Sequence, residues 1–213
     1  MKSYIDELDR NIFNFVEYEG YDDRYPSLSM QAFSSDFYDE IRHASRRLFQ
    51  IFCKAAKVFQ MAPDDFARNM DMPDNLIPYL HKSNALGLPT WLSRFDFVLD
   101  VNGNLRMVEL NADTPCFIIE SYYANEVAAN YVGRKHPNIE CRKELHTFLK
   151  RMYDAVLSAK YGRNQYESMR ANRESLPKDP FVFSCFHDYF EDYGTTQFLM
   201  NELKSACLEA DTR

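Results

Sequence analysis

Residues 94–111 have the sequence RFDFVLDVNGNLRMVELN, and the spacing of apolar side chains in this segment decides the fold class. Polar and apolar residues alternate on both sides of the dipeptide Asn102-Gly103, and a period of two is typical of β-strands. Asn-Gly between two alternating runs is a strong signal of a β-hairpin. The segment therefore predicts two antiparallel strands joined by a two-residue turn.

The predicted turn sets the register of the hairpin. With Asn102-Gly103 as a two-residue turn, Asp96 lies opposite Glu109 and Arg94 lies opposite Asn111. Because side chains alternate between the two faces of a strand, these four polar residues share one face. The opposite face is expected to be an apolar core surface, which carries Phe95, Phe97, Leu99, Val101, Val108 and Leu110.

Two carboxylates directly opposite each other repel, so the pair Asp96 and Glu109 needs compensation. One carboxyl can keep a proton, a cation can bridge both groups, or Arg94 can neutralise one of them in a structural network. Asn111 beside the pair favours the cation, because two carboxylates and an amide oxygen suit Mg²⁺. Arg94 can then bind a phosphate through two hydrogen bonds. Spacing alone supports the functional site and the structural network about equally.

Elsewhere the sequence predicts mostly helix. Over residues 35–60, apolar side chains recur at steps of three and four, which predicts an amphipathic helix with Ser34 or Ser35 as its N-cap. Further helices are expected after Pro63, after Pro73, and over residues 118–132, 141–160 and 195–208.

The C-terminal third is less regular. Residues 162–179 are polar without periodicity, which predicts a loop or a flexible segment. The run FVFSCF at 181–186 is apolar on both faces and is interpreted as a buried parallel strand, followed by an acidic loop. The predicted fold class is therefore α/β, helix-rich and leaning towards α+β, with a β-hairpin at 94–111 and a parallel strand at 181–186.

Composition narrows the class of protein. The 213 residues carry a net charge of −7, which argues against a nucleic-acid partner. No apolar stretch is long enough for a membrane span, and no signal peptide is evident. The five cysteines lack metal-ligand spacing, so we expect free thiols and a cytoplasmic location. Surface or packing roles are expected for His43, His81, His136 and His146.

The segment RFDFVLDVNGNLRMVELNADTP at 94–115 resembles the pattern R-(F/M)-D-F…E-(Y/L)-N-A-D-T-P of the glutathionylspermidine synthase family. Residues 183–199, FSCFHDYFEDYGTTQFL, are also similar to that family, so the likeness extends from about residue 92 to the C-terminus. The resemblance implies the N-terminal portion of an ATP-grasp fold. Members join a carboxylate to an amine through an acyl-phosphate and convert ATP to ADP.

The resemblance also implies roles for single residues on the hairpin. Asp96, Glu109 and Asn111 match the family's Mg²⁺ ligands, and Arg94 matches the arginine that contacts the transferred phosphate and acyl group. The implied cofactor is Mg²⁺, with ATP as a substrate. The implied partners are a glutathione-like peptide and a polyamine or another amine.

Four further residues are candidates for substrate binding. Thr114 matches a hydroxyl near the thiol-peptide substrate, whereas Cys116 departs from the Ser or Thr that relatives commonly have. Glu191 and Asp192 are candidates for holding a cationic amine. Capping of a helix and compensation of its dipole explain two acidic residues there more simply, and the residues alone favour that interpretation.

The expected function is that of an ATP-dependent carboxylate–amine ligase, with three segments at residues 1–90, 91–160 and 161–213. The first is a helical region, the second bears the hairpin site, and the third begins a Rossmann-like pre-ATP-grasp unit. We expect the chain to be the N-terminal part of the enzyme, without the half that holds the nucleotide. The alternatives are a non-catalytic remnant that binds a small molecule or a partner, and a hydrolase with a carboxylate dyad.

Overall fold

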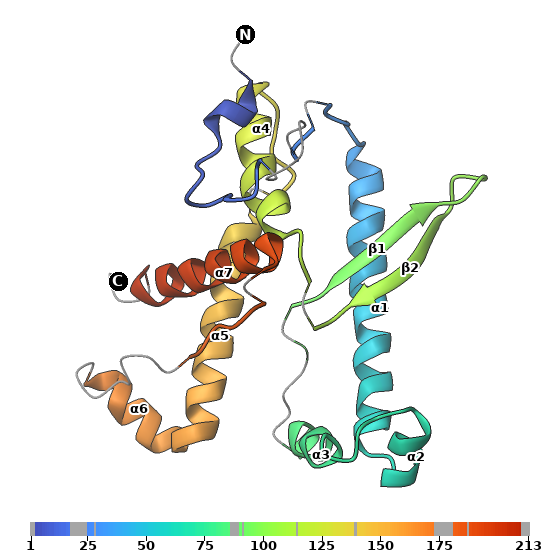
Figure 1. Cartoon of the computed structure of the whole chain (residues 1–213), viewed down its shortest axis with the longest axis vertical. Helices are drawn as coiled ribbons and strands as arrows, with labels where there is room; N and C mark the ends of the chain where they lie inside the picture. Colours follow the sequence, from blue (N-terminus) through green and yellow to red (C-terminus); the bar gives the residue numbers. More distant parts are fainter. Residues whose placement is uncertain are drawn as a thin grey trace. The chain divides into compact units, whose positions relative to one another are not determined.

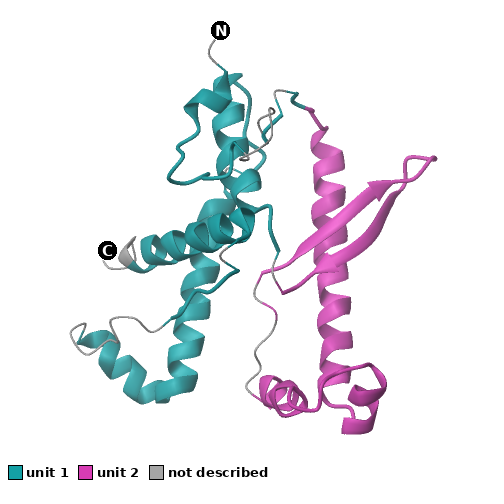
Figure 2. Cartoon of the chain, viewed as in Figure 1, with its two compact units in different colours: residues 1–30, 114–213 teal, residues 31–113 magenta. Residues whose placement is uncertain are grey.

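The fold was obtained as a computed structural model, which describes residues 3–17, 25–27, 29–85, 90, 92–113, 115–138, 140–172, 181–186 and 188–209. The chain divides into two compact units (Figure 2). Unit 1 combines residues 1–30 with residues 114–213, and unit 2 consists of residues 31–113. Unit 1 is therefore discontinuous in sequence, whereas the three predicted segments were consecutive.

The mixed, helix-rich fold class is confirmed. The described residues contain one sheet, in which β1 (Arg94–Leu99) pairs with β2 (Leu105–Asn111) in antiparallel orientation. The parallel strand expected at 181–186 is wrong, because these residues form no strand and lie outside that sheet. The side chains of Val182 and Phe186 are 93% and 75% exposed, so the apolar run is not buried as a central strand would be.

Unit 2 is built around a long amphipathic helix (Figure 1). Helix α1 (Ser35–Gln60) has the predicted bounds, and the Ser34 hydroxyl caps it by accepting a hydrogen bond from the Phe37 amide at 3.2 Å. The apolar face of the hairpin packs against this helix, where the Phe95 and Phe52 ring centroids lie 5.9 Å apart. The short helices α2 (Asp64–Asn69) and α3 (Ile77–Ala85) follow Pro63 and Pro73 as predicted.

The regular elements described in unit 1 are all helical. Its elements are η1 (Tyr4–Glu7), η2 (Glu120–Ala124), α4 (Asn125–Tyr131), α5 (Cys141–Tyr161), α6 (Arg163–Ala171) and α7 (Phe190–Glu209). The 3-10 helix η1 packs against α4, and η2 is a π-helical turn directly before α4. Its fully buried core side chains come from both parts of the sequence: Phe13, Phe15, Val16, Ile119 and Leu157.

Helix α6 lies within residues 162–179, where a loop was predicted, so that prediction is wrong for residues 163–171. The helix is held by one buried aromatic side chain, because the Tyr166 hydroxyl donates to the Asp154 carboxylate of α5 at 2.5 Å. Arg163 and Glu167 add an ion pair of 2.9 Å across one helical turn. Arg170 of α6 also approaches Asp154, with Nη1 3.6 Å from Oδ2. Polar contacts with one carboxylate of α5 thus replace the apolar stripe by which such a helix is normally recognised.

Helices α5 and α7 are joined by a buried carboxylate. Glu202 on α7 is 4% exposed and accepts hydrogen bonds from three nitrogen atoms of α5. Arg142 approaches it with Nε at 3.1 Å and Nη2 at 2.8 Å, and His146 with Nε2 at 2.6 Å. Because a buried charge is costly unless it is paired, this network fixes how the two helices pack.

A membrane-crossing helix is not found among the described residues, since none combines the required length with enough apolar character.

Helix α7 also packs closely on the N-terminal segment through Gly194. A Cβ atom at this position would lie 2.6 Å from Asn14 Oδ1 and 2.7 Å from Phe15 Cε1. The Asn14 amide can rotate away, but the Phe15 ring is fully buried and has no space to move.

We predict that Gly194→Ala lowers the free energy of unfolding by about 1–3 kcal/mol, because overpacking outweighs the gain in helix propensity. Urea denaturation followed by circular dichroism measures the change. The control is Asn201→Ala on the exposed side of α7, which should stay within about 0.5 kcal/mol of the parent chain. A Gly194→Ala chain as stable as the parent would contradict the packing.

Candidate functional site

The turn of the hairpin has three residues, where two were predicted. The Asp100 amide donates to the Asn104 carbonyl at 2.9 Å, and the Gly103 amide donates to the Asp100 carbonyl at 2.8 Å. Gly103 has φ +79°, the left-handed conformation that suits glycine and closes this kind of turn. Asp100 and Asn104 are therefore the last residues that pair before the turn, which displaces the register by one residue from the prediction.

Asp100 organises this turn through its carboxylate. Oδ1 accepts hydrogen bonds from the Asn102 and Asn104 amides at 3.0 Å and 2.8 Å, and Oδ2 accepts one from Arg106 Nε at 3.0 Å. The Asn104 backbone N–H, the largest contribution, holds the pKa of this carboxyl below its usual range. Sequence reasoning missed this role, although an aspartate two residues before Asn-Gly is a recognisable turn signal.

A β-bulge at Val108 corrects the displaced register before the polar residues are reached. Phe97 pairs with Met107, but the next pair is Asp96 with Glu109, so β2 contributes one extra residue, Val108. Without the bulge, Glu109 would lie opposite Phe95 on the apolar face. The predicted opposition of Asp96 and Glu109 is thus confirmed, although the turn that was used to predict it differs.

The bulge also changes the composition of the apolar face. Leu105 and Met107 lie opposite Leu99 and Phe97, and both are partly buried. Val101 and Val108, which were expected on that face, are 100% and 60% exposed, so their assignment is wrong. Val101 lies in the turn and Val108 is the bulged residue, and neither position continues the alternation.

A continuous row of polar side chains crosses the end of the hairpin away from the turn: Arg94, Asp96, Glu109 and Asn111. Arg94 forms a bidentate ion pair with Asp96, with Nε 2.6 Å from Oδ1 and Nη2 2.9 Å from Oδ2. Arg94 Nη2 lies 4.0 Å from Glu109 Oε1, and the same oxygen accepts a hydrogen bond from Asn111 Nδ2 at 2.8 Å. We call these four residues the polar row.

Electrostatics bears on the role of Asp96 in the arrangements that spacing left open. The hydrogen bonds from Arg94, followed by its charge, hold the pKa of Asp96 below its usual range. A hydrolytic dyad needs an acid with a raised pKa, so Asp96 is unsuited to that role. Neutralisation by Arg94 is present in this structure, through its two bonds to Asp96.

The ligand chemistry of the polar row fits a hard divalent cation. Asp96 and Glu109 offer carboxylate oxygens. Asn111 binds Glu109 through its amide nitrogen, so its amide oxygen takes no part in that hydrogen bond. Each Asp96 oxygen that accepts from Arg94 has a second lone pair. The described residues contain no cluster of three or more His, Cys, Asp and Glu suited to a metal, so this site would depend on two carboxylates and an amide.

Unit 1 brings together two of the predicted substrate-binding residues. The Cys116 thiol donates to Asp192 Oδ1 at 3.2 Å. The residue after Cys116, Phe117, has φ +82°, which is strained for a residue with a side chain. Glu191 and Asp192 lie in the first turn of α7, which begins at residue 190 and not at 195, so the acidic loop expected there is wrong in part.

The position of these acidic residues fits compensation of the helix dipole, since carboxylates are stabilising at a helix N-terminus. Their predicted contact with an amine stays a prediction. Thr114 lies outside the described residues.

Comparison with known families identifies the family of the chain. A sequence model described as glutathionylspermidine synthase preATP-grasp matches residues 4–212. No curated protein and no solved structure matches the chain. The family match covers the N-terminal helices as well as the hairpin and α7, and so extends further than the two motifs in the sequence. The chain belongs to the glutathionylspermidine synthase family, of which it contains the preATP-grasp region.

Proposed function

We propose that the polar row is the magnesium- and phosphate-binding part of an ATP-dependent carboxylate–amine ligase. Membership of the family supports a ligase-associated domain. The observation that carries the finer proposal is the direct opposition of Asp96 and Glu109, with Arg94 and Asn111 on the same face. Opposed carboxylates are a costly arrangement for a solvent-exposed hairpin, and a cation-binding role gives a reason for it.

Asp96, Glu109 and Asn111 are proposed to hold Mg²⁺ through oxygen atoms. When bound, the ion would neutralise charge on the phosphates of ATP. Arg94 is proposed to bind the transferred phosphate. Its planar guanidinium carries five N–H donors, a geometry that suits bidentate binding of a phosphate.

The proposed reaction has two transfers. An oxygen of the acid substrate attacks the terminal phosphorus of ATP, and the bond to ADP breaks to give an acyl-phosphate. The amine nitrogen then attacks the acyl carbon, phosphate leaves, and the nitrogen loses a proton. Both steps gather negative charge on phosphoryl oxygens, which a positioned guanidinium stabilises.

The substrates proposed are a glutathione-like peptide and a polyamine or another amine. Glu191 and Asp192 give the first turn of α7 an acidic surface, which favours a cationic amine. The peptide substrate is proposed to contact Thr114 and Cys116. The Cys116 thiol is hydrogen-bonded to Asp192. The cysteines of the described residues are free thiols, which supports a cytoplasmic location.

The bidentate bond between Arg94 and Asp96 favours a second candidate, a non-catalytic domain in which the polar row is a structural network. Under that alternative the row binds no cation. The two proposals therefore differ in whether the polar row binds a cation, and this can be measured on the 213-residue chain.

We predict that the chain binds Mg²⁺ through the polar row, and that Asp96→Asn and Glu109→Gln each weaken binding at least about tenfold, because each removes a charged ligand. Isothermal calorimetry with MgCl₂ measures the affinity. Asp71→Asn is the control, since it removes the same charge from an exposed position of unit 2 with φ 58°, which asparagine also tolerates. Parent and variants that all bind Mg²⁺ equally, or a parent that binds none, would favour the structural network.

We also predict that Arg94→Lys raises the pKa of Asp96, because lysine keeps the positive charge but loses the planar fork. The lowered pKa of Asp96 stabilises the folded hairpin at pH values above the ordinary aspartate pKa of about 3.9. This stabilisation disappears as the pH falls through the pKa of the folded state. Carbon-detected NMR titration of the Asp96 carboxyl measures both values, and an unchanged pKa in the variant would show that Arg94 does not control this carboxyl.

A further inference from the structure

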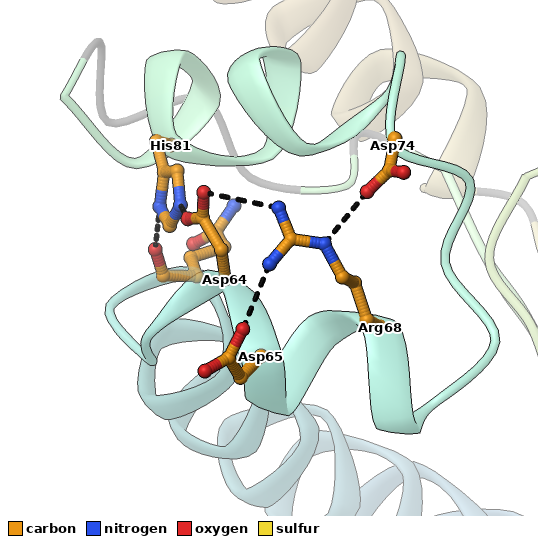
Figure 3. Close-up of polar contacts among 6 residues, drawn as sticks. Asp64, Asp65, Arg68, Asp74 and His81 are labelled. Atoms are coloured by element: carbon orange, nitrogen blue, oxygen red, sulfur yellow. Dashed lines mark hydrogen bonds and ion pairs between the residues drawn. The ribbon is translucent and has the colours of Figure 1, made fainter.

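A second polar cluster lies in unit 2, where α1, α2 and α3 meet (Figure 3). His81 on α3 approaches the other two helices with its two ring nitrogens. Nδ1 lies 2.8 Å from the backbone carbonyl oxygen of Gln60, the last residue of α1. Nε2 lies 2.9 Å from Oδ1 of Asp64, the first residue of α2.

Both of these partners are acceptors only. A backbone carbonyl and an ionised carboxylate carry no proton to donate, so each hydrogen bond needs an N–H from the ring. A neutral imidazole has one N–H and can satisfy one partner, whereas an imidazolium has two and satisfies both. The observed geometry at His81 therefore matches the charged form of the side chain.

The surrounding charges favour the same form. Asp64 also faces Arg68, whose Nη2 lies 3.8 Å from Oδ2, but Arg68 bonds more closely to Asp65 at 2.8 Å and to Asp74 at 2.7 Å. Three carboxylates thus surround a single guanidinium, which leaves a surplus of negative charge beside His81 (Figure 3). The other cations at these helix ends, Lys57 and Lys82, have solvent-exposed side chains.

The hydrogen bond to Asp64 is the largest of the effects that raise the pKa of His81, and the bond to the Gln60 carbonyl adds to it. The C-terminus of α1 contributes a further reason, because the last carbonyl groups of a helix lack partners within the helix and carry partial negative charge. A positively charged His81 caps one of these groups and is stabilised by it.

We propose that His81 is a proton-controlled clasp, which in its charged form ties the end of α1 and the start of α2 to α3. Loss of one proton leaves a ring nitrogen with a lone pair facing an acceptor, so one of the two connections is lost. A second bond between α1 and α3, from Gln60 Nε2 to Ser83 Oγ at 2.8 Å, contains no titratable group. The clasp is independent of any function of the polar row.

The direction of the pH dependence follows from the raised pKa. A histidine with a raised folded-state pKa contributes stability that is fully present below its ordinary value of about 6.5. The contribution is lost as the pH rises through the pKa of the folded state. The corner between α1, α2 and α3 is therefore tighter in mildly acidic solution than in alkaline solution.

The test is an NMR titration of the His81 ring in the complete 213-residue chain. We expect a pKa above the ordinary histidine value, and a lower pKa in the Asp64→Asn variant. Asp65→Asn is the matched control, because Asp65 is the next residue of the same helix turn and also pairs with Arg68, but the bond to His81 comes from Asp64. A parent pKa at or below the ordinary value, or an equal decrease in both variants, would overturn the proposal.

Hydrogen exchange supplies the structural readout. After correction for intrinsic exchange rates, amide protection in α2 and α3 should decrease as the pH rises through the His81 midpoint. In His81→Gln, protection should show no such step. Protection that is independent of the His81 midpoint in the parent, or a step that persists in the variant, would show that the proton does not control the clasp.

Discussion

The polar face of the hairpin depends on one extra residue in β2, the bulged Val108. The three-residue turn displaces the register by one, which would carry Glu109 to the face that packs on α1. A carboxylate on that face would lose part of its hydration against aromatic rings without a cation beside it, which is unfavourable. The bulge returns Glu109 to its place opposite Asp96, so two local irregularities cancel at the site.

The bond between Arg94 and Asp96 gives the polar row two compatible roles. The Arg94 and Asp96 side chains are 35% and 36% exposed, and ion pairs with this degree of exposure contribute about 0–1 kcal/mol. A pair this weak compensates the opposed carboxylates when no cation is present. Because both side chains are partly exposed, the pair can rearrange when a magnesium ion and phosphate oxygens offer competing charge-assisted bonds. The Arg94–Asp96 pair is therefore compatible with a metal-free state of the proposed ligand site.

Local patterns in the sequence predicted the elements whose stability is local. Helix α1 and its Ser34 cap followed from periodicity and a capping preference. The opposition of Asp96 and Glu109 was predicted from a two-residue turn, and it is right because the three-residue turn and the bulge offset each other. The elements that depend on distant partners were missed. Residues 181–186 have the apolar composition of a central strand but find no strand to pair with among the described residues. Helix α6 is held by contacts of Tyr166 and Arg170 with Asp154 of α5. The bulge was also missed, since nothing local distinguishes Val108 from any other strand valine.

The proposed role of the hairpin is tested most directly by paramagnetic relaxation with Mn²⁺, which accepts the same oxygen ligands as Mg²⁺. Substoichiometric Mn²⁺ added to the isotope-labelled chain broadens the amide signals nearest to the bound ion. The account predicts that residues 94–96 and 109–111 broaden first, that added Mg²⁺ restores them, and that the acidic turn around Asp100 and the cluster around Asp64 are much less affected. Broadening centred on either of those two acidic sites, or none that Mg²⁺ reverses, would contradict it.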